Sequence, residues 1–355
     1  MVQLARVREK AGLLRLYHGA VDRVDFEALV GGDIRSLARA ISQVESAEPG
    51  SGALLERIWD RRSGETGPAS HVVGLTGPPG SGKSTMADAL TRLWRDRGRR
   101  VAVLAVDPNS PFTGGAILGD RVRMQRHALD SGVFIRSMGA RGHLGGVSLA
   151  TRGAVRLLDA LGWEMVVVET VGVGQSELEI CEIADSVVVV TTPGTGDGIQ
   201  VIKAGITEIA DIFAVNKADV PGVERVTREL RDMIRLSAAR AGWKPPVVRA
   251  ISAEGAEGVR DLAEAIDAHR VQMLASGELT KRMVRRIRDE VVELVALRAR
   301  SFARAELAEQ GLGPLAEDAR RADPQAAADL LLERFRQKGS NIGDKSALTV
   351  APRRD

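Results

Sequence analysis

The chain has 355 residues, which is enough for one full domain with appended segments. It is 44% hydrophobic and 27% charged, as is typical of soluble proteins, and its formal net charge of +3 does not require a nucleic-acid partner. Its one cysteine, Cys181, excludes an internal disulfide framework and favours a reducing compartment. No apolar run reaches the length of a membrane span, and the N-terminus lacks a signal-peptide core. We therefore expect a cytoplasmic protein with no membrane and no nucleic-acid partner.

Residues 1–70 are expected to form an N-terminal helical segment. Apolar residues recur at helical spacing from Phe26 to Val44, and Asp33 is a candidate helix cap after Gly31-Gly32. A stretch rich in Gly, Ser and Pro, 63–70, reads as a linker to the next part of the chain.

Residues 71–270 alternate short apolar runs with helical patterns. The runs are Val72–Thr76, Val101–Val106, Val133–Ile135, Met165–Val168, Val187–Val190, Ile212–Val215 and Val247–Ile251. Nearly continuous apolar runs are typical of parallel strands that are covered on both faces. The pattern predicts an α/β fold with a doubly wound, mainly parallel sheet, and a ligand at the carboxyl ends of its strands.

Residues 271–338 are expected to form a C-terminal helical arm. Val284, Ile287, Val291 and Leu294 make one apolar seam, which needs either the chain's own sheet domain or a second copy to pack against. Basic residues on the same helix could suggest RNA binding, but no aromatic residues interleave with them to stack bases. Residues 339–355 lack periodicity and are predicted to be a flexible tail.

The most informative motif follows the first apolar run. Residues 77–84 read G-x-x-x-x-G-K-[ST], the pattern of a phosphate-binding loop, and a helical pattern comes next. In such a loop the backbone amides surround phosphate oxygens, the lysine reaches the β- and γ-phosphates, and the serine can ligate Mg²⁺. The alternative is a glycine-rich turn that binds nothing. The predicted phosphate-binding residues are Gly77, Pro78, Pro79, Gly80, Ser81, Gly82, Lys83, Ser84 and Thr85.

A second motif indicates which base is bound. Asn216-Lys217-Ala218-Asp219 reads N-K-x-D and follows the run Ile212–Val215. An aspartate there can accept hydrogen bonds from N1–H and the exocyclic amine of guanine, whereas adenine would leave that carboxylate unpaired. Ser252-Ala253, after the run that ends at Ile251, is a candidate backbone contact to the base, although a plain strand-to-loop junction would look the same.

Acidic residues that follow strands are candidates for the metal site. Asp107 ends one run and Glu169 ends another, which are expected positions for carboxylates that hold Mg²⁺ directly or through water. Asp120 lies in a glycine-rich stretch. Each of the three could instead be a helix cap or a turn residue. His143, between glycines, could contact a ligand or serve only the structure.

Taken together, these motifs resemble one family. They follow one another in a set order: the phosphate loop, Val106–Pro111, Gly114–Arg121, Arg136–Met138, Arg141–Gly146, Glu169–Glu177 and Asn216–Asp219. The set closely resembles the MeaB/ArgK-type P-loop GTPases, whose human relative is the methylmalonic aciduria type A protein. The resemblance covers nearly the whole chain and is most specific between residues 74 and 220.

The resemblance implies a function that spacing does not show. These GTPases are chaperones of adenosylcobalamin-dependent acyl-CoA mutases, usually methylmalonyl-CoA mutase. They couple GTP binding and hydrolysis to GDP to loading of intact cofactor and expulsion of damaged cofactor. They are homodimers through the C-terminal arm, and an adenosyltransferase is a further implied partner.

The resemblance also implies residue roles. Lys83, Asp120 and Glu169 would be catalytic, and Ser84, Asp107 and Glu169 would serve Mg²⁺. Asn216, Lys217 and Asp219 would bind guanine. Gln200 and Lys203 lie in a stretch that resembles the family's extra switch loop, through which the nucleotide state is signalled to the mutase. Glu169 stands where Ras-like proteins have an aspartate, and the residue that positions the attacking water is not identified.

Two other function classes stay open. A metal-insertion GTPase of the kind that serves nickel enzymes would need a Cys/His delivery site, and the sequence has one Cys and five scattered His. A small-molecule kinase related to amino-acid transport would need an acceptor pocket and would transfer phosphate to the amino acid.

Overall fold

The structure is a computed structural model that describes residues 24–46, 50–62, 69–107, 125–127, 129–139, 146–170, 179–194, 209–236, 242–310 and 323–343. Contacts divide the chain into two units, Met1–Ile287 and Arg288–Asp355. The first unit contains the sheet, and helix α12 (Glu278–Gln310) begins in it and continues into the second.

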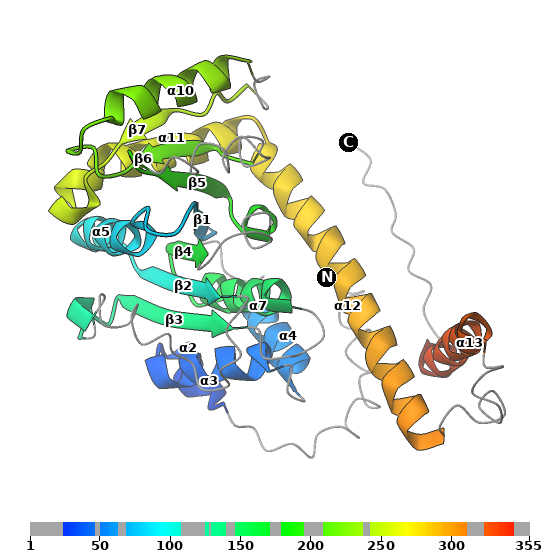
Figure 1. Cartoon of the computed structure of the whole chain (residues 1–355). Coiled ribbons are helices and arrows are strands. Elements are labelled where there is room, and N and C mark those ends of the chain that lie inside the picture. The colour runs from blue at the N-terminus through cyan, green and yellow to red at the C-terminus, as the bar shows by residue number, and fades with distance from the viewer. Residues whose placement is uncertain are drawn as a thin grey trace. The chain divides into compact units, whose positions relative to one another are not determined.

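A seven-stranded sheet forms the centre of the first unit (Figure 1). Its order is β3-β2-β4-β1-β5-β6-β7, and every neighbouring pair is parallel. The strands are β1 (His71–Thr76), β2 (Val101–Asp107), β3 (Val133–Gly139), β4 (Met165–Thr170), β5 (Ser186–Thr191), β6 (Ile212–Val215) and β7 (Val247–Arg249). The predicted doubly wound α/β fold is therefore confirmed.

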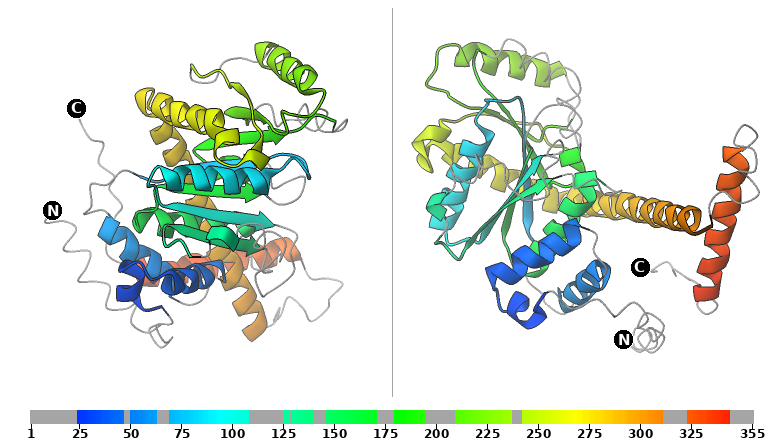
Figure 2. Two further views of the ribbon diagram at one scale, coloured as in Figure 1. Left: turned by 90° about the vertical axis from the view of Figure 1, so that its left-hand side faces the viewer. Right: turned by 60° about the horizontal axis from the view of Figure 1, so that its bottom comes forward.

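The strands are apolar on both faces because helices cover both (Figure 2). Val72 of β1 packs in one core cluster and its neighbour Val73 packs in the other, since successive side chains of a strand point to opposite faces. Helices α5 (Lys83–Asp96) and α11 (Arg260–Ala275) cover one face. The other face is covered by α3 (Ile34–Glu45), α4 (Ser51–Arg62), α7 (Gly146–Ala160) and α10 (Val223–Leu236).

The N-terminal helices begin where the sequence predicts. Asp33 caps α3, because its carboxylate accepts a hydrogen bond from Ser36 N–H at 2.7 Å, and Gly32 before it has a positive φ of 90° after the short helix α2 (Phe26–Val30). Leu37 and Ile41 of α3 lie in the core cluster of the sheet. These helices are thus packed onto the sheet. The predicted linker 63–70 lies outside the described residues except at Ala69 and Ser70.

Four strands extend beyond their predicted ends. β2 continues to Asp107, β3 to Gly139, β4 to Thr170 and β5 to Thr191, although the added residues are mostly polar. Backbone pairing does not require apolar side chains, and the β2–β3 register runs unbroken from Val101↔Val133 to Asp107↔Gly139. β7 ends early, at Arg249. The extension of β4 places Glu169 inside a buried strand.

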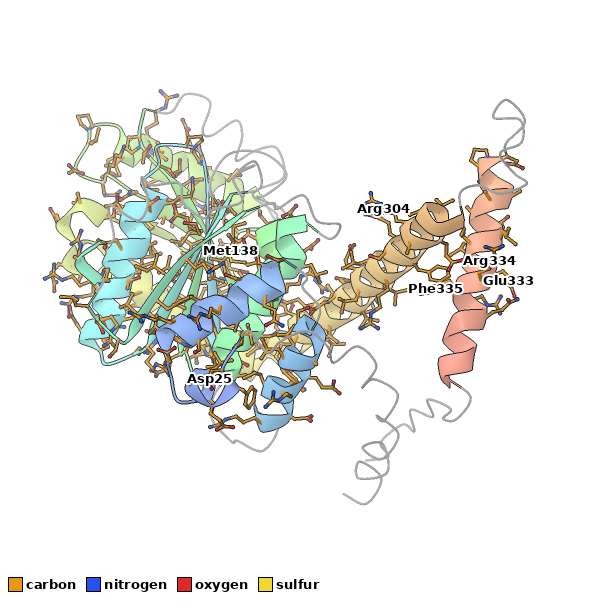
Figure 3. The ribbon with its side chains drawn as sticks, turned by 90° about the horizontal axis from the view of Figure 1, so that it is seen from below. Asp25, Met138, Arg304, Glu333, Arg334 and Phe335 are labelled. Carbon is orange, nitrogen blue, oxygen red and sulfur yellow. The ribbon has the colours of Figure 1, made fainter. Side chains whose placement is uncertain are left out.

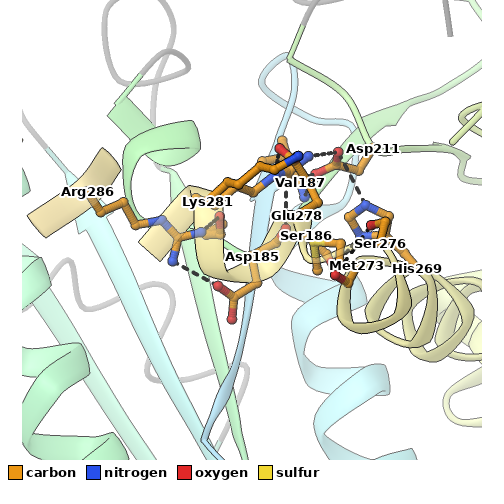
Figure 4. Close-up of polar contacts among 12 residues, drawn as sticks. Asp185, Ser186, Val187, Asp211, His269, Met273, Ser276, Glu278, Lys281 and Arg286 are labelled. Carbon is orange, nitrogen blue, oxygen red and sulfur yellow. Dashed lines mark hydrogen bonds and ion pairs between the residues drawn. The ribbon is translucent and has the colours of Figure 1, made fainter. Parts of the chain in front are cut away.

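Helix α12 is fastened to the amino ends of two strands (Figure 4). Arg282 donates to both carboxylate oxygens of Asp211, which precedes β6, at 2.8 and 2.9 Å. One turn on, Arg286 donates to Asp185, which precedes β5, at 2.8 Å. The predicted amphipathic helix 281–306 is thus confirmed as part of α12, and its basic residues include two that anchor it.

The second unit contains the rest of α12 and helix α13 (Pro324–Gly343). The rings of Phe302 of α12 and Phe335 of α13 pack at an interplanar angle of 59°, with their centroids 5.3 Å apart, and Arg334 approaches the buried Glu306 at 3.6 Å (Figure 3). Helix α13 extends past residue 338, at which the predicted arm ends. The boundaries at 70, 270 and 338 stay predictions.

None of the helices in the described part of the chain combines the length and apolar character that a bilayer crossing requires. Cys181 is half-buried in the 3-10 turn η3 (Ile180–Glu182) and packs against the core of the sheet.

Candidate nucleotide-binding site

The predicted phosphate loop connects the central strand β1 to helix α5. Gly77, Gly80 and Gly82 have positive φ angles of 138°, 74° and 89°, which glycine adopts without strain. Gly82 is the N-cap of α5 and makes no side-chain cap hydrogen bond. Anions bind at such helix N-termini through the first backbone N–H groups. This is the geometry that a phosphate requires.

Close packing is a second reason for glycine at both ends of the loop. A Cβ on Gly77 would lie 2.1 Å from the carbonyl oxygen of Val190, and one on Gly82 would lie 2.3 Å from Nδ2 of Asn216. The loop is therefore pressed against β5 on one side and against the N-K-x-D motif on the other.

Lys83 and Ser84 begin helix α5 and face the loop. The Lys83 ammonium donates to the carbonyls of Gly77 and Pro78 at 2.7 and 3.1 Å, so the buried side chain curls back over the loop. The Ser84 hydroxyl donates to Oε1 of Glu169 at 2.6 Å. Glu169 is buried at the end of β4, the strand beside β1. A cation, a hydroxyl and a carboxylate thus meet at the mouth of the loop.

The side-chain oxygens of Ser84 and Glu169 are suitable ligands for Mg²⁺. Magnesium prefers oxygen ligands and is usually held by one or two carboxylates together with substrate phosphates. The adjacent Ser84 hydroxyl and Glu169 carboxylate supply two protein oxygens, whereas within the described residues His, Cys, Asp and Glu nowhere form a group of three that could hold a metal ion. Asp107 ends β2, and its side chain lies outside the described part of the structure.

Asn216 joins the phosphate loop to the predicted guanine side. Its Nδ2 donates to the Ser81 carbonyl at 2.9 Å, and its Oδ1 accepts from Ser252 N–H at 3.0 Å. The next residue, Lys217, donates from Nζ to the Gly80 carbonyl at 3.1 Å. Three segments far apart in the sequence are thereby held at one edge of the sheet.

Asp219 lies exposed on the turn after β6, where its carboxylate is accessible to a ligand. The turn is held by the Ala218 N–H, which donates to the Ala250 carbonyl at 3.1 Å. Lys217 before it is the one non-glycine residue with a positive φ, 54°, among those described. Ser252 is buried and Ala253 exposed in the turn η5 (Ser252–Glu254) on the far side of Asn216.

The remaining residues predicted to bind phosphate differ in exposure. Pro78 is buried, Pro79 is exposed and Thr85 is half-buried in α5. Asp120, His143, Gln200 and Lys203 lie outside the described residues.

One residue near the site has no sequence motif. Asp88 is a buried carboxylate four residues after Ser84 on α5. The only sequence signal is this spacing of four, which places both side chains on one face of the helix.

A phosphate loop after the central strand of a doubly wound parallel sheet, fastened by Asn216 to an N-K-x-D turn, defines a P-loop GTPase fold. The chain belongs to the MeaB family, since the model of the methylmalonyl-CoA mutase-associated GTPase MeaB matches residues 37–307. The resemblance seen in the sequence is thus confirmed.

Individual relatives agree. A protein of Pyrococcus horikoshii described as a GTPase is 46% identical over 87% of this chain and 96% of its own length. The mitochondrial methylmalonic aciduria type A homolog of Mus musculus is 38% identical over 73% of this chain and 65% of its own length. The solved structure of a LAO/AO transport system kinase superposes with a TM-score of 0.61 at 27% identity and covers 88% of this chain and 96% of that one.

Proposed function

We propose that this chain binds and hydrolyses GTP, and that its nucleotide state gates the loading and rescue of adenosylcobalamin on an acyl-CoA mutase. Membership in a family of mutase-associated GTPases supports the GTPase activity and suggests the partner. Methylmalonyl-CoA mutase is the mutase that we propose, with an adenosyltransferase as a further partner.

The observation that carries the nucleotide assignment is the double contact of Asn216. Because the Asn216 side chain bonds both the Ser81 carbonyl and the Ser252 amide, the phosphate loop lies beside the two loops that are expected to contact the base. A nucleotide whose phosphates are bound by the phosphate loop would reach Asp219 with its base, and a carboxylate there is selective for guanine.

The proposed chemistry is phosphoryl transfer to water with little covalent participation by the protein. Lys83 and the amides at the start of α5 stabilise the negative charge that develops on the γ-phosphate. Ser84, Glu169 and Asp107 would hold Mg²⁺, which when bound would neutralise negative charge on the phosphates. We assign Asp120 a supporting catalytic role. Basal turnover is expected to be slow, since no arginine in the sequence is identified as stabilising the transferred phosphate.

Signalling is proposed to follow the loss of the γ-phosphate. The chain that follows Asp107 and Glu169 would then change its contacts and alter the surface that faces the partner. Gln200 and Lys203 are proposed to pass the nucleotide state to the mutase.

Calorimetry with GTP, GDP and ATP in the presence of Mg²⁺ tests the nucleotide assignment. We expect binding of GTP and GDP, no comparable binding of ATP, and release of free phosphate from GTP. Lys83→Ala should abolish tight GTP binding, because the loop carbonyls and the phosphates lose their shared cation. No heat with GTP, or unaltered hydrolysis by Lys83→Ala, would contradict the proposal.

The partner is tested separately by pull-down. Purified methylmalonyl-CoA mutase should be retained by the immobilised chain to different extents with GDP and with a non-hydrolysable GTP analogue. Gln200→Ala and Lys203→Ala should reduce that difference and leave GTP affinity unchanged. Equal retention in both nucleotide states would defeat the proposed gating.

The kinase relative makes one further control necessary. With GTP labelled at the γ-phosphate, and with arginine, ornithine or lysine added, the label should leave as free phosphate. Label recovered on the amino acid would instead identify a kinase.

A further inference from the structure

Asp88 is a buried carboxylate that lies beside the proposed metal site but does not belong to it. It follows Ser84 by one helical turn, so both side chains lie on the same face of α5. Only 6% of its side chain is exposed. An ionised carboxylate at such a position needs hydrogen-bonding or charged partners, because burial removes its water.

Both partners of Asp88 come from one short element, the 3-10 turn η2 (Gln125–His127). His127 Nε2 lies 3.0 Å from Oδ1 of Asp88, and Arg126 Nη2 lies 2.8 Å from Oδ2. His127 is itself buried, and Arg126 is half exposed. The two oxygens of Asp88 therefore hold two successive residues of η2 against the P-loop helix.

A second contact joins the chain between η2 and β3 to helix α5, further from the phosphate loop. Arg95, in the last turn of α5, makes a two-pronged ion pair with Asp130, at 2.8 Å for both contacts. Asp130 also accepts from Gly132 N–H at 2.8 Å. Because the Arg95 pair already joins this part of the chain to α5, the Asp88 cluster is not needed merely to attach it.

The contacts of Asp88 also fix how far η2 lies from Ser84. Gln125 is where the described chain resumes after β2, and the predicted catalytic Asp120 precedes Gln125 by five positions. A chain spans at most about 3.5 Å per residue, so the place where η2 is held limits how far from Ser84 the preceding residues can lie. An error of about 1 Å in such a position can cost about a hundred-fold in rate.

We propose that Asp88 is a positioning residue for GTP hydrolysis, which acts by holding Arg126 and His127 against the Ser84 face of the P-loop helix. Asp88 does not contact the nucleotide. It sets the spacing between the helix that presents Ser84 and η2, the described element that is nearest in sequence to the predicted catalytic Asp120. This inference rests on the proposed function and adds to it a residue that no motif identifies.

Single-turnover hydrolysis of GTP by the full chain at saturating Mg²⁺ tests the proposal, with GDP affinity and the thermal midpoint measured on the same samples. The disruptive variants are Asp88→Ala and His127→Ala. The conservative variant is His127→Gln, which keeps an N–H group near the position of Nε2. The matched control is Asp130→Ala, which breaks the ion pair with Arg95 that also joins this part of the chain to α5.

We expect Asp88→Ala and His127→Ala to lower the hydrolysis rate constant about ten-fold or more while GDP affinity changes less than about three-fold. His127→Gln should recover most of the rate. Asp130→Ala should lower the thermal midpoint and leave the rate constant unchanged. If Asp88→Ala fails to fold, the pair of His127 variants decides.

The proposal is overturned if the Asp88 and His127 variants keep the wild-type rate, or if Asp130→Ala lowers the rate as much as they do. The second result would mean that the connection matters only for stability. Failure of the proposed function itself would be distinct, because the unmodified chain would then show neither GDP binding nor release of phosphate.

Discussion

At the residue scale, guanine selectivity is assigned to one exposed carboxylate. Asp219 lies on the turn after β6, and Asn216 at the start of that turn is tied to Ser81 of the phosphate loop at 2.9 Å. An aspartate here accepts two hydrogen bonds from guanine. An asparagine would accept only one and would donate the other, so it would suit a base that offers one donor and one acceptor.

Asp219→Asn is therefore expected to lower GTP affinity by about a hundred-fold or more and to raise affinity for xanthosine triphosphate. Calorimetry with both nucleotides measures the change. Asp232→Asn, an exposed aspartate on α10 that pairs with Arg235, is the matched control. Unchanged selectivity in Asp219→Asn would remove this residue from the base pocket.

A buried polar cluster at the amino ends of β1, β5 and β6 resembles a Ser-His-Asp triad but cannot act as one (Figure 4). Ser186 Oγ lies 2.7 Å from His269 Nδ1, and His269 Nε2 lies 3.4 Å from Asp211. His71 Nε2 lies 2.8 Å from the same Ser186 hydroxyl. Ser186 is fully buried, so no substrate can reach its oxygen, and the cluster is structural.

The same cluster predicts a loss of stability in acid. Burial, with the nearby cation Arg270, lowers the pKa of His71 well below its ordinary value of 6.5, and burial also lowers the pKa of His269 despite the carboxylate of Asp211. The unfolded chain therefore binds protons that the folded chain does not. Stability is complete above about pH 6.5 and falls as the pH drops from there through the folded-state values.

We expect the thermal midpoint of His71→Gln to fall less than that of the unmodified chain between about pH 7 and about pH 5. The glutamine can keep a hydrogen bond to Ser186 but carries no titrating ring. Differential scanning calorimetry at a series of pH values measures this. Parallel curves for the two proteins would show that His71 does not contribute to acid sensitivity.

At the scale of elements, the residues at the amino ends of β5 and β6 bind helix α12. Asp185 accepts from Val72 N–H of β1 and Asp211 accepts from Val187 N–H of β5, both at 2.9 Å. Each aspartate thus continues the hydrogen bonding of the sheet past the strand ends. Arg282 and Arg286 then neutralise the two buried charges. The arginines of α12 are spaced four apart because the helix meets two adjacent strands on one face.

Arg282→Ala should therefore destabilise the chain by about 3 kcal/mol or more, because it leaves Asp211 buried without its strongest partner. Urea unfolding measures the loss. The control is Arg225→Ala on α10, which removes an exposed pair with Glu229 at 2.8 Å and should change the stability little, because water screens such a pair. Equal effects of the two substitutions would contradict the proposed anchoring role.

The elements also show where sequence patterns succeed and fail. All seven predicted runs are strands, because apolar residues on both faces leave few alternatives to a covered parallel strand. The ends were predicted less well. Arg136 and Ser137 lie in β3 because the backbone of β2 pairs with them, and a hydropathy pattern does not register that pairing.

At the scale of the whole molecule, the apolar face of α12 is exposed in the single chain. Val284, Val291 and Val295 are 62%, 53% and 54% exposed. We propose that a second copy of the chain covers this face. An exposed row of branched apolar side chains on one helix otherwise favours aggregation.

The double substitution Val284→Asp and Val291→Asp should convert a dimer to a monomer, since burying two carboxylates in an apolar interface costs more than the contacts stabilise. Light scattering coupled to size-exclusion chromatography measures the mass. Leu129→Asp, at a fully exposed leucine in the turn before β3, is the control and should leave the mass unchanged. A monomeric unmodified chain would contradict the proposed dimer.

The local order of residues was enough to indicate the sheet, the phosphate loop and the guanine motif. Each of these depends on short-range chemistry, namely glycines where φ is positive, apolar residues where a strand is covered twice, and N-K-x-D after a strand. Only the folded chain could show that Asn216 ties Ser81 to Ser252, that Asp88 holds Arg126 and His127, or that two arginines of α12 meet Asp185 and Asp211. Those contacts join positions tens of residues apart, and a linear pattern holds no record of which distant groups come within hydrogen-bonding distance.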